Sequence, residues 1–149
     1  MRLLMTCVLL GTLAGCEDKA IDLGATDRKD PPAEKELKVP DAGAKVETVG
    51  LNAAVKGSIG KEVKKNVYVL VTPLSNAELK NVWWVQGAVT RKGEAYECEA
   101  QFGEADAGAG EYFAVVGIAT DKEYEAGEQL KGLPAGATYT KLKIVKRPK

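Results

Sequence analysis

Short stretches in which apolar and polar residues alternate recur along the second two-thirds of this 149-residue chain. A period of two is typical of β-strands, because successive side chains point to opposite faces of a sheet. The alternation predicts strands at residues 51–57, 66–72, 82–86, 95–102, 111–120 and 138–145. Turns rich in Gly and Asn separate these strands, and the sequence contains no convincing long helix and no internal repeat.

Two of these segments, 66–72 and 111–120, are apolar on both faces. A strand that is covered on both faces lies in the interior of its sheet, so we expect both segments to be central strands. Pro73 ends the first segment, because proline cannot donate a hydrogen bond to a neighbouring strand. The pattern as a whole predicts an all-β fold: an antiparallel β-sandwich of about six to seven short strands, spanning residues 49–149.

Three motifs in this domain resemble small immunoglobulin-like sandwich modules of bacterial envelope proteins. They are Trp83-Trp84-Val85-Gln86-Gly87, Phe102-Gly103 and the apolar run from Ala109 to Val116. The resemblance covers residues 50–146 and implies an immunoglobulin-like β-sandwich. It implies nothing specific about a ligand.

The chain begins with an apolar segment of a different kind. Arg2 is followed by thirteen residues, 3–15, that are almost all apolar or small. A helix of this length spans about 20 Å, which is less than the ~30 Å hydrocarbon core of a bilayer. The segment therefore has the length of the apolar region of an export signal.

The segment ends in Leu13-Ala14-Gly15-Cys16, and charged residues follow at once. This motif resembles the lipobox of bacterial lipoproteins, in which the cysteine is obligatory. The resemblance implies that residues 1–15 are a removable signal peptide and that Cys16 becomes the diacylglycerol-bearing first residue of the mature protein. We therefore expect a lipid anchor in a bacterial cell envelope. Because Glu17 stands where retention in the inner membrane favours Asp, we expect the outer membrane, facing the periplasm.

Residues 17–48 are dominated by charged residues and contain three prolines. Apolar residues are sparse, so little surface can be buried to offset the entropy of ordering this segment. We predict that residues 16–48 form the lipidated N-terminus and a flexible, disordered tether. The alternative is a short partner-binding helix at residues 33–38, although an isolated helix of this length is marginal in water.

Trp83 and Trp84 are adjacent on a predicted strand and therefore point to opposite faces of its sheet. We expect one of them in the core. The other is either a platform that stacks on a sugar or a peptide aromatic, or is covered by a loop. Gln86 shares the face of Trp84 and favours that face as the outer one of the sandwich. Trp83, Trp84 and Gln86 are the candidate binding residues.

Cys98 shares its strand face with Tyr96 and Ala100, so we expect a buried thiol that packs as a small apolar side chain. Once the N-terminal cysteine is lipidated, no other cysteine of the mature chain can pair with it. Glu97 and Glu99 point to the opposite face. They are therefore expected in solvent and not in a cleft of the kind that glycoside hydrolysis requires.

The loop at residues 103–111 carries Glu104, Asp106 and Glu111, whose carboxylates suggest a calcium site. Calcium loops, however, place oxygen ligands more densely than this spacing does. A solvated hairpin loop is the favoured interpretation.

The composition and motifs of the sequence argue against several kinds of active site. The chain contains no histidine, which is the commonest general base and metal ligand. It also lacks a phosphate-binding loop, a dinucleotide-binding glycine motif and a zinc-binding spacing. Its formal net charge of +0 gives no reason to expect a nucleic-acid partner. We expect no enzyme activity, no catalytic residue, no cofactor and no metal.

The partners that we expect follow from the anchor and from the tryptophans. The membrane is bound through the lipid on Cys16. The folded domain recognises an envelope protein or supports an envelope assembly, and a carbohydrate such as peptidoglycan is the alternative ligand.

Replacement of Cys16 by alanine tests the anchor. We expect the intact mass of the mature wild-type protein to include a diacylglyceryl group and the protein to fractionate with membranes, because each buried CH₂ stabilises insertion by about 0.8 kcal/mol. The Cys16→Ala protein should carry no lipid and should leave the membrane fraction. Full membrane partitioning of that variant would rule out the lipoprotein interpretation.

Overall fold

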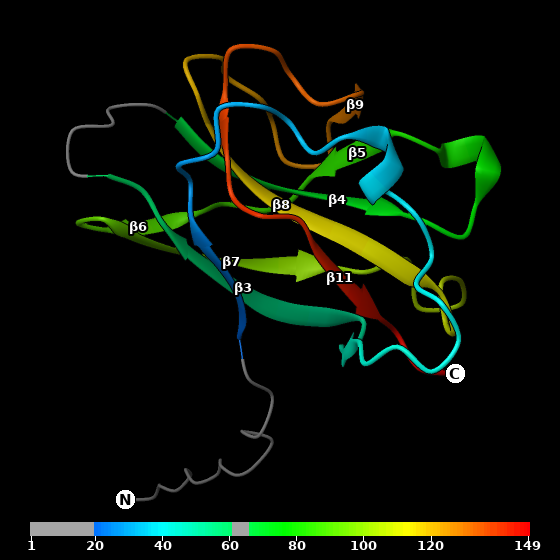
Figure 1. Ribbon diagram of the computed structural model, residues 1–149. Coiled ribbons are helices and arrows are strands. Elements are labelled where there is room, and N and C mark those ends of the chain that lie inside the picture. Colours follow the sequence, from blue (N-terminus) through cyan, green and yellow to red (C-terminus); the bar gives the residue numbers. More distant parts are fainter. Residues whose placement is uncertain (1–19, 61–65) are drawn as a thin grey trace, which may run out of the picture.

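The computed structural model describes residues 20–60 and 66–149. These residues form two facing β-sheets of four and seven strands (Figure 1). The predicted signal peptide and Cys16 lie outside the described residues, so their assignment stays a prediction. Within the described part, no helix is both long enough and apolar enough to cross a bilayer.

The smaller sheet has the strand order β1-β3-β7-β6. Its strands are β1 (Ile21–Ala25), β3 (Asn52–Ser58), β7 (Ala95–Gln101) and β6 (Thr90–Lys92). β3 is antiparallel to β7 and β7 to β6, whereas β1 runs parallel to β3. The alternation that predicted β7 is complete: Tyr96, Cys98 and Ala100 are buried, and the residues between them are exposed.

The larger sheet has the order β2-β11-β8-β4-β5-β9, and β10 pairs with β8 beside this path. Its strands are β2 (Glu47–Thr48), β11 (Lys143–Lys146), β8 (Tyr112–Thr120), β4 (Asn66–Pro73), β5 (Val82–Val85), β9 (Gln129–Lys131) and β10 (Thr138–Tyr139). Within this sheet, only β2, which is parallel to β11, departs from antiparallel pairing among the described strands. β4 and β8 are interior strands, as their two apolar faces predicted.

The all-β prediction is confirmed, but two of its details are wrong. The described residues form eleven strands instead of six or seven, and the sheets are mixed instead of purely antiparallel. Each of the six predicted segments contains a strand, and the last is divided into β10 and β11. The strands that were not predicted, apart from β1, have only two or three residues, too few to display a period.

The first core lies between the two sheets. Phe102 and Phe113 meet there edge to face, with their ring centroids 5.7 Å apart. Buried side chains of both sheets surround this pair, among them Ile21, Val55, Val69, Val71, Cys98, Val115 and Val145. The inward-facing half of each alternating strand supplies these residues.

A second core covers the opposite face of the larger sheet. Trp83 and Tyr139 are its largest members, and both are completely buried. The smaller sheet does not reach this face. Side chains from the chain before β2 and from the excursion between β8 and β11 cover it instead, including Leu37, Tyr124, Leu130, Leu133 and Leu142. β4 and β8 are apolar on both faces because each of their faces packs against one of the two cores.

The prediction of a flexible tether is wrong for residues 20–48. β1 pairs with β3 and buries Ile21 completely, and β2 pairs with β11. We call residues 26–46, which connect these two strands, the strap (Figure 1). The strap passes over the second core, where the main chains of Arg28 and Tyr139 exchange two hydrogen bonds of 2.9 and 2.7 Å. This segment is therefore part of the folded domain.

Local interactions shape the strap further. The guanidinium of Arg28 donates to both carboxylate oxygens of Glu36, at 3.2 and 2.8 Å, and lowers the pKa of that carboxyl. Glu36 also accepts the main-chain N–H of Ala33 at 2.6 Å. The alternative of a helix at residues 33–38 is wrong, because only the three-residue 3-10 turn η3 (Glu34–Glu36) forms there. The other such turn of the described chain is η4 (Ala77–Leu79).

Replacement of Ile21 by alanine tests whether β1 belongs to the domain. The change removes a completely buried side chain from the first core, so we expect the free energy of unfolding to fall by about 2–5 kcal/mol. Val39 provides the matched control, because it lies in the strap with 42% of its surface exposed. Val39→Ala should change stability by less than about 0.5 kcal/mol. Equal denaturant midpoints for the two variants would show that β1 is not packed.

Candidate functional site

β5 places the two tryptophans on opposite faces of the larger sheet, as predicted. Trp83 is completely buried in the second core, and its indole N–H donates to the side-chain oxygen of Asn81 at 3.0 Å. A buried indole needs such a partner. Trp83 is therefore a core residue without a surface for a ligand.

Trp84 is half-buried and is more exposed than Trp83. The prediction that its face is the outer one is wrong, however. Trp84 stands opposite Val71 in the pairing of β5 with β4, and Val71 belongs to the core between the sheets. Trp84 thus faces the smaller sheet, at an edge that this sheet does not close.

The open edge contains a groove of about 630 Å³, which we call the Trp84 groove. Trp84 and Val71 line one side of it. Glu99 and Gln101 of β7 line another, and parts of the loop at residues 103–111 form a third. The volume lies within the range of about 300–1,000 Å³ that is usual for ligand sites.

The groove is open because two strands diverge. β6 pairs with β7 only between Ala95 and Glu97. In the described chain, no strand pairs with this side of β7 from Cys98 to Gln101. β5 ends before Gln86, where the chain leaves the larger sheet to reach β6. The two sheets therefore separate on this side, next to an unpaired strand edge.

Gln86 links the two sheets through hydrogen bonds at this edge. Its main-chain N–H donates to the carbonyl of Val69 at 2.9 Å. Its side-chain Nε2 donates to the carbonyl of Trp84 at 3.0 Å, and its Oε1 accepts the main-chain N–H of Gln101 at 2.8 Å. The Gln86 oxygen therefore occupies the position that the carbonyl of a neighbouring strand would take beside β7.

A buried arginine fixes the loop wall of the groove. Arg147, only 8% exposed, directs its guanidinium into the loop that follows β7. The guanidinium donates to the carbonyl oxygens of Phe102, Glu104, Ala107 and Ala105, at 2.9, 2.7, 2.9 and 3.4 Å. These carbonyl oxygens are therefore bound by the guanidinium, and the described residues contain no group of three or more His, Cys, Asp or Glu side chains that could hold a metal ion.

Sequence reasoning did not identify Arg147. In the sequence it is one of several cations near the C-terminus, and its partners are about forty residues away. The glycine at position 103 is the one feature of the sequence that could have indicated a tight loop here. It has a φ of 82°, and a Cβ there would lie 2.7 Å from the carbonyl oxygen of Ala107. Only glycine therefore fits this tight loop.

The charged side chains that line the groove are all negative. Three carboxylates, those of Glu99, Glu104 and Glu111, line it, and no Lys or Arg is among its described lining residues. The structure records no salt bridge to any of the three within its described residues. The prediction that Glu99 is exposed is confirmed, but the prediction that it lies outside a cleft is wrong, because Glu99 lines the groove.

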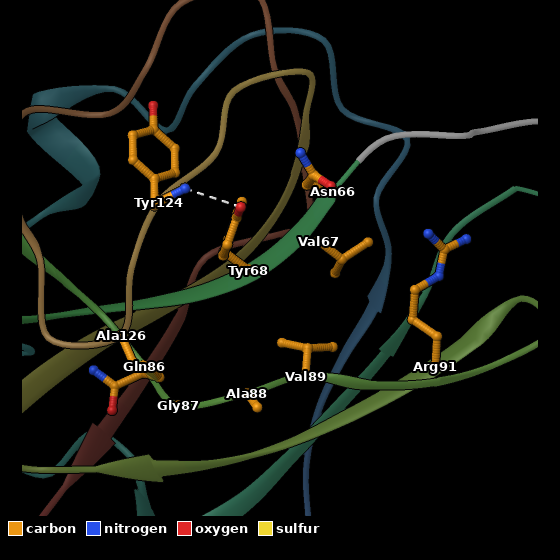
Figure 2. Close-up of a pocket in the computed structure, with 10 residues that line it drawn as sticks. All are labelled: Asn66, Val67, Tyr68, Gln86, Gly87, Ala88, Val89, Arg91, Tyr124 and Ala126. Carbon is orange, nitrogen blue, oxygen red and sulfur yellow. Dashed lines mark hydrogen bonds between the residues drawn. The ribbon is translucent and has the colours of Figure 1, made fainter.

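A second hollow, of about 420 Å³, shares Gln86 and Gly87 with the groove (Figure 2). Tyr68 and Tyr124 pack edge to face beside it, with centroids 5.3 Å apart, and the Tyr68 hydroxyl accepts the N–H of Tyr124 at 2.9 Å. Arg91 lines its other end. Because these aromatic side chains bind one another, the hollow is the weaker candidate.

Cys98 is buried, as predicted, with 4% of its surface exposed. Its sulfur lies 3.6 Å from the carbonyl oxygen of Gly87 and 3.4 Å from that of Glu99. Burial raises the pKa of the thiol to about 11, so it is protonated at neutral pH. A protonated, buried thiol is a poor nucleophile.

This raised pKa predicts a loss of stability at alkaline pH. The pKa of the thiol rises from 9.0, its ordinary value, to about 11 in the folded chain. Its contribution to stability is therefore complete below pH 9 and is lost as the pH rises toward 11. Between pH 8 and pH 10 we expect wild type to lose about 1 kcal/mol more than Cys98→Ala. Parallel denaturation curves for the two proteins at both pH values would contradict the raised pKa.

Comparisons of this chain with protein-family models, with curated proteins and with solved structures return no match. The groove and its chemistry therefore carry the functional argument.

Proposed function

We propose that the protein is a lipid-anchored component of the bacterial cell envelope whose folded domain binds a ligand in the Trp84 groove. The observation that carries the binding site is the half-buried indole of Trp84, which lines a 630 Å³ groove between the sheets. The lipobox resemblance ending at Cys16 supports the anchor. Glu17, the residue after Cys16, favours the outer membrane, facing the periplasm, as the location of the anchor.

The proposed function is binding without catalysis and without a cofactor. The chain has no histidine to act as a general base. Its described cysteine, Cys98, is buried with a raised pKa. Glu99 and Glu104 are exposed to solvent, whereas a catalytic acid requires an environment that keeps it protonated.

The ligand that this site suits is one that enters a groove. Val39 is the only large apolar side chain that the described residues leave exposed, so a flat apolar docking patch finds no support. A partner in the envelope that inserts an extended segment is the first candidate. Trp84 favours a carbohydrate as the second, because an amphipathic indole ring can stack on a sugar.

We also propose that the fold is immunoglobulin-like. The two sheets of an immunoglobulin domain have the orders A-B-E-D and C-F-G. With β1, β3, β7 and β6 as A, B, E and D, and with β4, β8 and β11 as C, F and G, both observed orders agree. β5 takes the C′ position beside C. The parallel pairing of β1 with β3 departs from a purely antiparallel sandwich.

Position-specific photo-crosslinking in living cells tests the proposed function. A photoreactive phenylalanine analogue replaces Trp84 in the full-length protein, and the same analogue replaces Glu97, which is exposed and does not line the groove. We expect an adduct of increased mass from position 84 and not from position 97. Adducts of equal yield at both positions, or none at position 84, would contradict ligand binding in the groove. Membrane fractionation of the same cells reports on the anchor independently.

A further inference from the structure

We propose that the ligand of the Trp84 groove is an extended segment of a basic peptide that lies along the free edge of β7. The inference rests on the proposed binding function and names the class of its ligand. Three features support it: an unpaired strand edge, the charge of the lining, and the hydrogen bonds that three of the groove's four amide side chains already make within the protein.

The strand edge supplies main-chain recognition. Among the described strands, none covers β7 beyond Glu97 on the groove side. An extended peptide can add to such an edge as a further strand, and its main chain then contributes binding that does not depend on sequence. The N–H of Gln101 already bonds to a side-chain oxygen, that of Gln86, at 2.8 Å. A peptide carbonyl can replace that oxygen without leaving the N–H unpaired.

The lining supplies selectivity for charge. Glu99, Glu104 and Glu111 contribute three carboxylates, and the described lining contains no Lys or Arg. A Lys or Arg side chain of the peptide can pair with a carboxylate and can lie over the indole of Trp84. Alternate side chains of an extended peptide point the same way, so every second residue can reach this lining. Among the charged side chains that line the groove, an acidic peptide would meet only carboxylates.

The amide side chains argue against a sugar. Amides are common partners of sugar hydroxyls, but three of the four amide side chains that line the groove already bind the protein itself. The Nε2 of Gln86 donates to the carbonyl of Trp84 at 3.0 Å, Gln101 donates to the carbonyl of Gly103 at 2.8 Å, and Asn76 accepts the N–H of Glu78 at 3.0 Å. The fourth amide is that of Asn52, so most of the polar lining that remains available is carboxylate.

Binding of defined peptides to the mature protein in detergent tests the inference. The probe is a fluorescent, N-acetylated nonapeptide in which Lys and Val alternate, and the matched control peptide has Glu in place of Lys. We expect the Lys peptide to raise the fluorescence anisotropy and the Glu peptide to leave it unchanged. Salt should weaken binding of the Lys peptide, because exposed charge pairs are screened.

Variants locate the peptide. We expect Glu104→Gln combined with Glu111→Gln to weaken binding of the Lys peptide at least tenfold, and Trp84→Ala to do the same. Glu97→Gln removes one carboxylate outside the groove and should change the affinity less than twofold. Because Trp84→Ala can also lower stability, the double glutamine variant, with an unchanged melting temperature, is the decisive one. Methylation of alternate peptide nitrogens should abolish binding if the peptide pairs with β7.

The outcomes separate the ligand class from the proposed function. Binding of a chitin oligosaccharide that requires Trp84, without binding of the Lys peptide, would overturn the peptide and leave the binding function standing. Binding of the Lys peptide that the double glutamine variant retains would overturn the groove as its site. Failure of both probes overturns the proposed peptide; failure of the crosslink at position 84 overturns the binding function itself.

Discussion

Both faces of the larger sheet are apolar, and the rest of the structure follows from the need to keep both of them out of water. β4 and β8 pair along eight residues and present apolar side chains to each side. The smaller sheet covers one side and forms the first core. Nothing comparable is left for the other side, so the strap and the excursion between β8 and β11 cover it. Hydrophobic burial on two sides of one sheet thus determines where the irregular parts of the chain lie.

The groove is a gap in this arrangement. The chain leaves the larger sheet after β5 and joins the smaller sheet at β6, and the two sheets diverge where it crosses. Gln86 spans the divergence with an amide on one side. Arg147 holds the loop on the other side through four carbonyls, and as a buried cation it makes that loop a fixed wall. A site whose walls are fixed before binding loses little entropy when a ligand arrives.

A strand could be predicted from the sequence when it had enough residues for the alternation of apolar and polar side chains to show. β4, β7 and β8 have seven to nine residues, enough for their faces to be identified from alternation. The strap was misassigned because charged residues dominate its composition, while a few apolar residues at and around it, Ile21, Leu23, Leu37 and Val49, make its contacts. The opposite faces of Trp83 and Trp84 were predictable from their adjacent positions on β5. The groove could not be predicted, because it depends on where β6 stops along β7. The role of Arg147 could not be predicted either, because its partners are main-chain carbonyls distant in sequence.

The burial of Ile21 also limits how far the domain can be from the membrane. With the proposed lipid on Cys16, five residue steps separate the anchor from a side chain that is completely buried. Fully extended, these steps reach at most about 18 Å. If Cys16 carries the proposed lipid, the domain lacks the reach of a body on a long flexible linker. The anchor would then hold it beside the lipid surface, and a ligand of the groove would have to come to the membrane to be bound.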